Sequence, residues 1–170
     1  MKRNQMQYAI WDLDNCLSDD RSRIKLIDWA NPDMTARYAA YHAACVNDPA
    51  RNVEVFLAIT QLARPIFFTG RPESVRTDTS RWVRCELDIQ QPLILMRRND
   101  DHRPSVQVKS EMLAQYKFVL HQRNPYSQDA CYAAFDDRED IVDMYRQCGL
   151  DAALLSIHSV CAYNAPKAHK

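Results

Sequence analysis

Five short apolar runs, separated by stretches with helical spacing, constrain the fold of this chain more than any other feature. Each run is four or five residues long and is rich in Ile, Leu, Phe or Ala, which is typical of a buried strand. The runs lie at Tyr8–Trp11, Pro65–Phe68, Pro92–Met96, Cys131–Phe135 and Ala152–Leu155. Strands that alternate with helices form a parallel sheet with helices on both faces. The sequence therefore predicts an α/β protein with a doubly wound, mainly parallel sheet of five strands.

Four stretches between these runs repeat apolar residues at the three- or four-residue spacing of one helical face. They are Phe56, Ile59 and Leu62; Val75, Trp82 and Val83; Met112, Leu113, Tyr116 and Leu120; and Ile141, Val142, Tyr145 and Cys148. Gly149 directly follows the last stretch, and glycine commonly occupies the left-handed position just past a helix. We therefore expect four helices between the strands, the last of which ends before Gly149.

Two segments depart from this alternation. The first, from about 15 to 50, is polar and irregular, with two proline breaks and one helix expected near 36–44. The second is the tail from 158 to 170, which carries little pattern and is expected to be loose. A chain of 170 residues suits one compact domain. We therefore expect residues 1–170 to form a single domain with a cap-like insert at 15–50 after the first strand.

Composition limits the classes of function. Lys plus Arg and Asp plus Glu each number 22, so no strong overall attraction to nucleic acid or membrane is expected. The chain has only two glycines, which excludes the glycine-rich loops of P-loop and dinucleotide-binding proteins. Six scattered cysteines without a CxxC pair favour reduced thiols, and no signal peptide or membrane-spanning run is visible. We therefore expect a cytoplasmic protein; the sequence indicates no particular oligomeric state.

Polar residues follow four of the five predicted strands. They are Asp12 and Asp14, Thr69 and Arg71, Arg97, and Asp136 and Asp137. Ligands of open parallel sheets bind beyond the carboxyl ends of the strands, so these side chains are expected to meet at one edge. Asp12 and Asp14 are two residues apart, and in an extended chain such side chains point the same way. Paired acids after one strand are more often a solvated turn or a helix cap, but four such strand ends together indicate a functional site.

The chemistry of this set points to phosphate transfer. Three or four converging carboxylates would repel one another unless a divalent cation neutralised them, and a ligand set of oxygen atoms alone suits Mg²⁺. One carboxylate would then attack phosphorus, while a second would protonate the leaving oxygen and later activate water. Lys109 would balance the negative charge, while Thr69 and the amides around Gly70 would hold phosphoryl oxygens. The residues thus predict a Mg²⁺-dependent phosphomonoesterase.

The order of these motifs resembles the haloacid dehalogenase (HAD) phosphotransferase superfamily. That superfamily has a DxD motif after the first strand, a Thr or Ser after the second, a Lys, and paired acids after a late strand. The matching residues here are Asp12-Leu13-Asp14, Thr69, Lys109 and Asp136-Asp137. The resemblance implies a Rossmann-like three-layer fold, with Asp12 as nucleophile and Asp14 as acid and base. It also implies metal ligation by Asp12, by the main-chain carbonyl of Asp14, and by one or both of Asp136 and Asp137.

Residues 8 to 156 resemble more narrowly the 3′-phosphatase domain of phage polynucleotide kinase–phosphatase. The segments that carry this resemblance are Thr69-Gly70-Arg71-Pro72-Glu73, Met96-Arg97, Asp101-His102-Arg103-Pro104 and Asp136-Asp137-Arg138. The resemblance implies that Arg71 and Arg103 contact phosphate; phosphate addition, the task of the kinase domain, is not expected. Two residues depart from the family pattern: Cys16 replaces a usual Thr, and Ser105 replaces an Asp. The first is expected to matter little, whereas Ser105 would weaken or retune the site if the usual Asp orients the Lys or the Arg.

The insert offers candidates for substrate contacts. Six residues are of the kinds that touch phosphates or stack on a base: Arg21, Arg23, Trp29, Tyr38, Tyr41 and His42. Of these, Arg21, Trp29 and Tyr41 are the first candidates. The alternative is that Trp29 and Tyr41 only fold the insert against the core. His42 and His102 have no partner visible in the sequence and are expected to be ordinary surface or cap residues.

These observations favour a phosphomonoesterase that acts on a nucleotide or on the 3′-phosphate end of a nucleic acid, without a membrane partner. One alternative is a 5′-nucleotidase that acts on free nucleoside or deoxynucleoside monophosphates, which the sequence does not separate from the first. Another is a catalytically silent binding module of the same fold, although such a module would normally have lost an Asp of the first or last motif. A dehalogenase is disfavoured because that branch lacks the second Asp of the first motif, and Asp14 is present.

Overall fold

The computed structural model describes residues 8–123 and 131–157, and in this part the prediction of five parallel strands is confirmed. The strands are β1 (Tyr8–Trp11), β2 (Arg64–Pro72), β3 (Leu93–Arg97), β4 (Cys131–Asp136) and β5 (Asp151–Leu154). Their order is β3-β2-β1-β4-β5, and every neighbouring pair is parallel. The chain fills one side of β1 before it crosses to the other. The topological switch point therefore lies at the carboxyl ends of β1 and β4, where ligands of such sheets bind.

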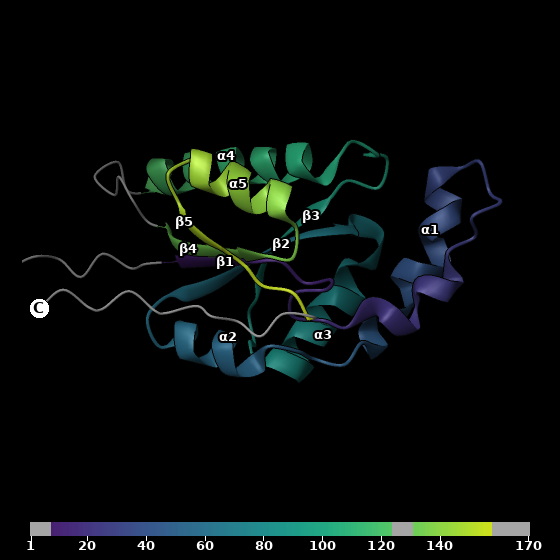
Figure 1. Ribbon diagram of the computed structural model, residues 1–170, viewed down its shortest axis with the longest axis horizontal. Helices are drawn as coiled ribbons and strands as arrows, with labels where there is room; N and C mark the ends of the chain where they lie inside the picture. The colour runs from purple at the N-terminus through teal and green to yellow at the C-terminus, as the bar shows by residue number, and fades with distance from the viewer. Residues whose placement is uncertain (1–7, 124–130, 158–170) are drawn as a thin grey trace, which may run out of the picture.

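Helices cover both faces of this sheet (Figure 1). One face carries α2 (Val53–Thr60) and α3 (Arg76–Leu87), and the other carries α4 (Ser105–Arg123) and α5 (Glu139–Gln147). Because successive strand residues point to opposite faces, Trp11 belongs to the core beside α2 and α3, whereas Ile10 belongs to the core beside α4 and α5. Trp11 stacks on Phe135 of β4 with ring centroids 4.1 Å apart. This packing joins the two strands that end at the switch point, and the three layers confirm the predicted Rossmann-like fold.

The ends of two helices differ from the apolar faces expected from the sequence. Leu62 lies beyond the end of α2 and is half exposed, because the chain turns there and buries Ala63 instead. Cys148 lies just beyond α5, where the chain also turns away, and is exposed. Gly149 has a φ of 82°, which confirms that it takes the left-handed position past the helix.

The insert between β1 and α2 forms three short 3-10 helices and one α-helix. These are η1 (Asp20–Ser22), η2 (Ile24–Leu26), α1 (Met34–Ala43) and η3 (Ala44–Asn47). The helix expected near 36–44 is α1, and Asp33 caps it by accepting a hydrogen bond from the amide of Thr35 at 2.9 Å. In Figure 1, α1 stands apart from the two helical layers, and none of its residues is fully buried. Its side chains are therefore accessible to a ligand.

The tail from 158 to 170 and the side chain of Leu120 lie outside the described residues, so both expectations stay predictions. Cys16 and Cys45 are buried free thiols, while Cys85 and Cys148 are exposed ones. None of the helices in the two described stretches has the length and apolar character that a bilayer crossing demands.

Candidate active site

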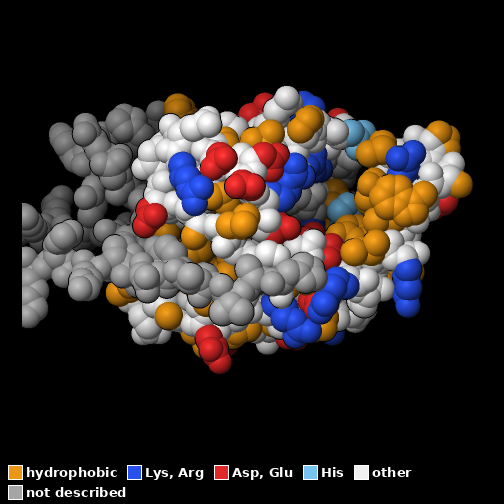
Figure 2. Space-filling view, viewed as in Figure 1, with side chains coloured by type: hydrophobic (Ala, Val, Ile, Leu, Met, Phe, Trp, Pro, Cys, Tyr) orange, Lys and Arg blue, Asp and Glu red, His pale blue; other side chains and the backbone are white. Residues whose placement is uncertain are grey.

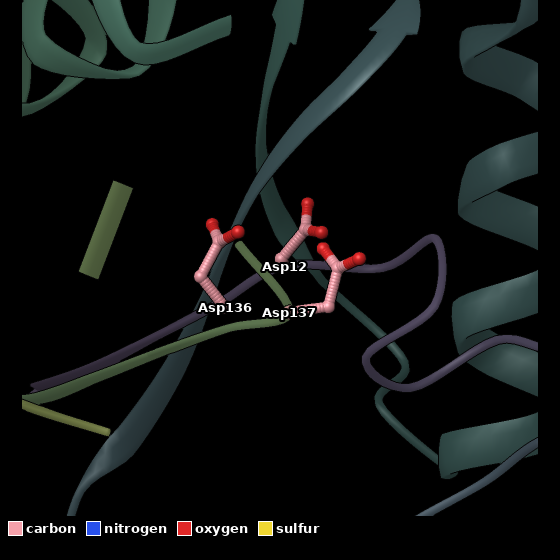
Figure 3. A group of neighbouring side chains, drawn as sticks. All are labelled: Asp12, Asp136 and Asp137. Carbon is pink, nitrogen blue, oxygen red and sulfur yellow. The ribbon is translucent and has the colours of Figure 1, made fainter. Parts of the chain in front are cut away.

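Three carboxylates meet at the switch point (Figure 3). Asp12 follows β1, Asp136 is the last residue of β4, and Asp137 comes next. One oxygen atom from each of these side chains lies within 4.8 Å of the other two. The amide of Asp12 donates to the carbonyl of Phe135 at 2.9 Å, so β1 and β4 leave the sheet side by side. We call these three residues the acidic cluster.

Lys109 of α4 is the cation that the fold places against the acidic cluster. Its Nζ lies 2.6 Å from Asp12 Oδ1 and 2.6 Å from Asp136 Oδ2, and all three side chains are buried. Burial raises the pKa of Asp12 well above its usual range, against the attraction of Lys109, and the neighbouring carboxylates add to the rise. Burial, with Asp136 adding to it, raises the pKa of Asp137 to about 6. One ammonium group therefore does not fully compensate the acidic cluster.

The donor set of the acidic cluster fits a divalent cation of the Mg²⁺ type. It consists of carboxylates alone, which are the hard oxygen ligands that Mg²⁺ prefers. Three carboxylates and one ammonium leave an excess of two negative charges, which one divalent cation neutralises. The side chain of Asp14 does not belong to this group.

Asp14 takes part in a different set of contacts. Its Oδ1 accepts hydrogen bonds from Arg23 Nη2 at 2.5 Å and from Arg71 Nη2 at 2.6 Å. The same two arginines also pair with Asp48, at 2.9 Å and 3.2 Å. We call these four residues the arginine–aspartate network. Both arginines and Asp48 are almost fully buried, and the pairing of two positive with two negative charges makes this burial tolerable.

The two carboxyl groups of the network titrate in opposite directions. Burial opposes the ionisation of Asp14, but Arg71 and Arg23 outweigh it and hold the pKa well below its usual range. Burial raises the pKa of Asp48 despite the same two arginines. The difference lies in the balance with the arginines, which lower the pKa of Asp14 by more than burial raises it but do not outweigh burial at Asp48. Asp14 is therefore the more firmly ionised of the two.

A cavity of about 730 Å³ lies over the acidic cluster. Its lining includes Asp12, Asp137 and Lys109. Residues of α1 form one side, namely Met34, Tyr38, Tyr41 and His42. The connection from β3 to α4 forms another side with Arg97, Asn99 and Arg103. Thr35 Oγ1 and His102 Nε2 lie 3.3 Å apart and join these two sides. The cavity thus has an aromatic wall on the insert and a cationic wall beside β3.

The residues expected to hold phosphate take different places around this cavity. Gly70 lines it, whereas Thr69 is fully buried and accepts a hydrogen bond at Oγ1 from the amide of Arg71 at 3.2 Å. Arg71 is fully buried too and does not line the cavity, because its guanidinium is bound in the arginine–aspartate network. Arg103 lines the cavity, but two carboxylates hold its guanidinium at 2.7 Å and 2.6 Å. The structure therefore does not bring Arg71 to the position expected of a phosphate contact.

Of the three first candidates in the insert, only Tyr41 lines the cavity. Arg21 is exposed and forms an ion pair with Asp19 at 2.5 Å. Trp29 is 66% exposed and lies outside the cavity, edge-on to Tyr38 with ring centroids 6.2 Å apart. The base-stacking role expected of Trp29 therefore fits its neighbour Tyr38 better.

Sequence reasoning noted Tyr38 and Tyr41 as residues suited to stacking but did not group them with Met34 on one helical face, and it missed Asp48. Met34, Tyr38 and Tyr41 recur at helical spacing, a signal that could have marked them as one face. His42, expected to be an ordinary cap residue, lies in the cavity wall, where burial lowers its pKa to about 4. Asp48 belongs to no motif, and nothing in the sequence indicates its two arginine partners.

The fold, the acidic cluster and the adjacent Lys109 define the class of the protein, which is a phosphatase of the HAD type. Residues 9–155 match the family model of the polynucleotide kinase PNKP phosphatase domain. This match covers most of the chain, so the chain belongs to that family, and the resemblance seen in the sequence is confirmed. No curated protein matches the chain.

Solved structures share this fold. A chain in the structure of the Pnkp1/Rnl/Hen1 RNA repair complex aligns with a TM-score of 0.60 and 21% identity, over 91% of this chain and 44% of that chain. A Clostridium difficile protein assigned as a phosphatase gives 0.56 and 16%, over 88% and 85% of the two chains. A hydrolase from Streptococcus pneumoniae TIGR4 gives 0.51 and 14%, over 89% and 94%. The present chain thus spans less than half the length of its counterpart in the repair complex.

Proposed function

We propose that the chain is a Mg²⁺-dependent phosphatase that removes the 3′-phosphate of a polynucleotide or nucleotide through an aspartyl-phosphate at Asp12. The observation that carries this proposal is the acidic cluster with Lys109 in a cavity whose volume suits a nucleotide-sized ligand. The family to which the chain belongs supports a polynucleotide end as the substrate. The RNA repair complex that contains a similar chain supports the same class of substrate.

Asp12, Asp136 and Asp137 would hold the cation. When bound, Mg²⁺ would neutralise these carboxylates and stabilise negative charge on the phosphoryl oxygens. Lys109 opposes the effect of burial on Asp12 and favours the carboxylate over the carboxylic acid. Together with the bound cation it would therefore hold Asp12 in the carboxylate form that attacks, and it fixes the position of its Oδ1.

Asp12 would attack phosphorus in line with the ester bond. A bond forms between an Asp12 oxygen and phosphorus, the bond from phosphorus to the sugar oxygen breaks, and the sugar oxygen takes a proton from the carboxylic acid form of Asp14. Water then attacks the phosphorus of the aspartyl-phosphate, loses a proton to a base, and releases inorganic phosphate. The Asp12 carboxylate is restored, so one residue serves every turnover.

Asp14 is our candidate for the group that moves these protons. Its Oδ1 is anchored by the two arginines, while its Oδ2 accepts no hydrogen bond from the residues that the structure describes. Asp14 also lines the cavity. To act as an acid it would carry a proton against the attraction of both arginines, whereas the ionised form suits a base. The ionised form that the arginines favour suits the base step, and the proton that Asp14 takes from water in that step is the one it gives to the next leaving group.

The face of α1 would receive the nucleoside. Tyr38 and Tyr41 line the cavity beside Met34, and aromatic rings of this kind stack on bases. One face of the Tyr41 ring is already covered by the guanidinium of Arg23, 4.0 Å from the ring centroid, and its hydroxyl donates to Asp20 at 2.5 Å. Tyr38 is less constrained and is therefore better placed to stack on a base. Figure 2 shows hydrophobic side chains gathered at this end of the molecule.

The test of this function compares three substrates in the presence of Mg²⁺. They are thymidine 3′-monophosphate, thymidine 5′-monophosphate and an oligonucleotide with a 3′-phosphate. We expect inorganic phosphate to be released from both 3′-phosphates and much less from the 5′-phosphate. The reverse preference would favour the 5′-nucleotidase. Release no greater than from an Asp12→Asn protein, which controls for contaminating phosphatase, would leave only the silent binding module.

Tyr38→Ala tests the role of α1 in binding the base. Stacking is worth roughly 1–3 kcal/mol per base, so we expect kcat/KM for thymidine 3′-monophosphate to fall about tenfold to a hundredfold. Hydrolysis of a small aryl phosphate is expected to change little. Tyr38→Phe is the matched control, because it keeps the ring that would stack and removes only the hydroxyl. Equal losses in the two variants would contradict the assignment.

A further inference from the structure

Arg97, the last residue of β3, is a cavity-lining cation whose hydrogen-bond partners are all neutral groups. Its Nε donates to the carbonyl of Gly70 at 3.2 Å, and its Nη2 donates to Ser105 Oγ at 2.9 Å. Its Nη1 donates to the carbonyls of Asp101 and Arg103 at 3.0 Å and 2.8 Å. A guanidinium group has five N–H donors, so one donor, on Nη2, remains for a ligand.

The other cations of the cavity wall are paired with carboxylates. Arg103 is held by two carboxylates at 2.7 Å and 2.6 Å, and Arg138 by Asp140 at 2.8 Å. Lys109 lies within the acidic cluster. Within the described part of the chain, Arg97 is therefore the cavity-lining cation that forms no ion pair.

Ser105 is the reason that Arg97 Nη2 contacts a hydroxyl and not a carboxylate. It is the first residue of α4, and its hydroxyl is the group that Arg97 Nη2 contacts. An Asp at this position would offer a carboxylate to Arg97 Nη2, where Ser105 offers a hydroxyl. Burial lowers the pKa of Arg97, and the nearby Arg103 and Arg138 add to this effect against the attraction of Asp101. An anion in the cavity would relieve this unfavourable environment.

Location points to phosphate as that anion. The arginines of the arginine–aspartate network and Lys109 are occupied by carboxylates. Arg97 contacts no carboxylate of the described residues and keeps a donor for a ligand in the wall of the cavity. Its contacts with Gly70 and Ser105 place it between the carboxyl end of β2 and the helix that carries Lys109. A phosphate ester would meet this charge as it enters.

We propose that Arg97, left without a carboxylate partner by Ser105, binds an anionic phosphate oxygen of the substrate through its remaining Nη2 donor. The inference rests on the phosphatase function proposed above. The phosphate concerned is the one that is removed; a second phosphate of a polynucleotide is the other source of the same chemistry. Ser105 therefore tunes the site toward tighter phosphate binding.

The experiment compares Ser105→Asp with Ser105→Asn in the full chain with Mg²⁺. The two side chains have the same size and both offer an oxygen to Arg97, but only Asp adds a charge. Orthophosphate binding is measured from its effect on Tm, which requires no turnover, and KM is measured for thymidine 3′-monophosphate and thymidine 3′,5′-bisphosphate. We expect Ser105→Asp to bind orthophosphate about tenfold more weakly than Ser105→Asn, the scale of one charge-assisted hydrogen bond.

Asn99→Asp controls for the charge alone. Asn99 lines the same cavity, but its side chain accepts a hydrogen bond from the amide of Ser74 and does not contact Arg97. If Ser105→Asp has a higher KM than Ser105→Asn for both substrates, Arg97 contacts the phosphate that is removed. If its KM is higher for the bisphosphate alone, Arg97 contacts a second phosphate. Both outcomes support the inference. Equal orthophosphate binding by the two Ser105 variants, or an equal loss in Asn99→Asp, would overturn it.

The same measurements separate this inference from the proposed function. Wild-type protein that binds orthophosphate more tightly than Ser105→Asp, yet hydrolyses none of the substrates, supports the anion site and rejects the phosphatase. Wild-type protein that hydrolyses them with the same KM as both Ser105 variants supports the phosphatase and rejects the role of Arg97.

Discussion

The arginine–aspartate network contains the buried charges whose removal we expect to destabilise the fold most. Arg23 donates from Nη2 to Asp14 at 2.5 Å, from Nε to Asp48 at 2.9 Å, and from Nη1 to the carbonyl of Tyr41 at 3.2 Å. The side chains of Arg23 and Asp48 are only 2% and 1% exposed. In Arg23→Met, a side chain of similar length without charge or donors leaves both carboxylates to Arg71 alone.

The size of the effect depends on burial. Breaking a surface ion pair costs about 0–1 kcal/mol, whereas removing one partner of a buried pair costs about 3–5 kcal/mol because an uncompensated charge stays behind. Arg23 belongs to the second group, but Arg71 still balances one of the two carboxylates. We therefore expect the free energy of unfolding to fall by about 3 kcal/mol, at the lower end of that range. For a chain of 170 residues this corresponds to a decrease in Tm of about 6–12 °C.

Acidity changes this loss in a definite direction. In the wild type, the lowered pKa of Asp14 stabilises the fold above the unfolded value of about 4, and this contribution is lost as the pH falls below it. In Arg23→Met, one of the two buried carboxylates is no longer balanced by an arginine. Its pKa in the folded state therefore rises above the unfolded value, and it takes up a proton at a higher pH. The difference in stability between wild type and variant is therefore expected to shrink as the pH falls from 7 toward 5.

Urea unfolding of the metal-free protein, followed by tryptophan fluorescence, measures this difference. Trp82 reports on the network, because its Nε1 donates to the carbonyl of Asp48 at 2.7 Å. Arg21→Met is the matched control: Arg21 belongs to the same insert and pairs with Asp19, but it is exposed. A loss of equal size in Arg21→Met and Arg23→Met, or a difference that widens on acidification, would refute the reasoning.

Three further predictions concern the nucleophile, the cation and the insert. Asp12→Asn is expected to keep the fold, seen by circular dichroism, and to lose turnover; more than a few per cent of wild-type activity would contradict an aspartyl-phosphate. Chelation is expected to abolish phosphate release reversibly, and Mg²⁺ but not Ca²⁺ is expected to restore it. The coordination shell of Ca²⁺ is larger and looser and would misplace the reacting groups. Full activity in excess chelator would exclude a metal requirement. The pKa of His42 is lowered to about 4, so its neutral form stabilises the fold above about pH 6.5, and up to about 3 kcal/mol is lost as the pH falls toward 4. Urea unfolding of His42→Gln is expected to show a flatter dependence on pH than the wild type.

The sheet and the acidic cluster could be predicted because both are encoded over short distances along the chain. A buried parallel strand needs an unbroken apolar run, and all five runs became strands. The parallel order then brings the residues that follow β1 and β4 to the same edge without further information. Asp12, Asp136 and Asp137 meet for this reason alone, and Lys109 joins them because α4 packs beside these strands.

The position of the Asp14 side chain could not be predicted in the same way. The expectation that it shares the direction of Asp12 assumes an extended chain, but β1 ends at Trp11 and the chain turns at Asn15, which has a φ of 61°. Asp14 then contacts arginines from the insert and from β2, and those contacts depend on how the insert folds. A motif therefore fixes where a functional residue lies along the backbone, while its charge partners follow from residues outside the motif.

The same argument explains why α1 was the least predictable part of the site. Apolar periodicity identifies a helix when its face packs against a core, but none of the α1 residues is fully buried in the protein. Its apolar and aromatic face, with Met34, Tyr38 and Tyr41, lines a cavity instead. In the proposed function, the partner of that face is the substrate, which the sequence does not contain. The reacting groups of that function lie at strand ends and can be predicted from short motifs, whereas the face that would select the substrate is recognised only from the cavity it lines.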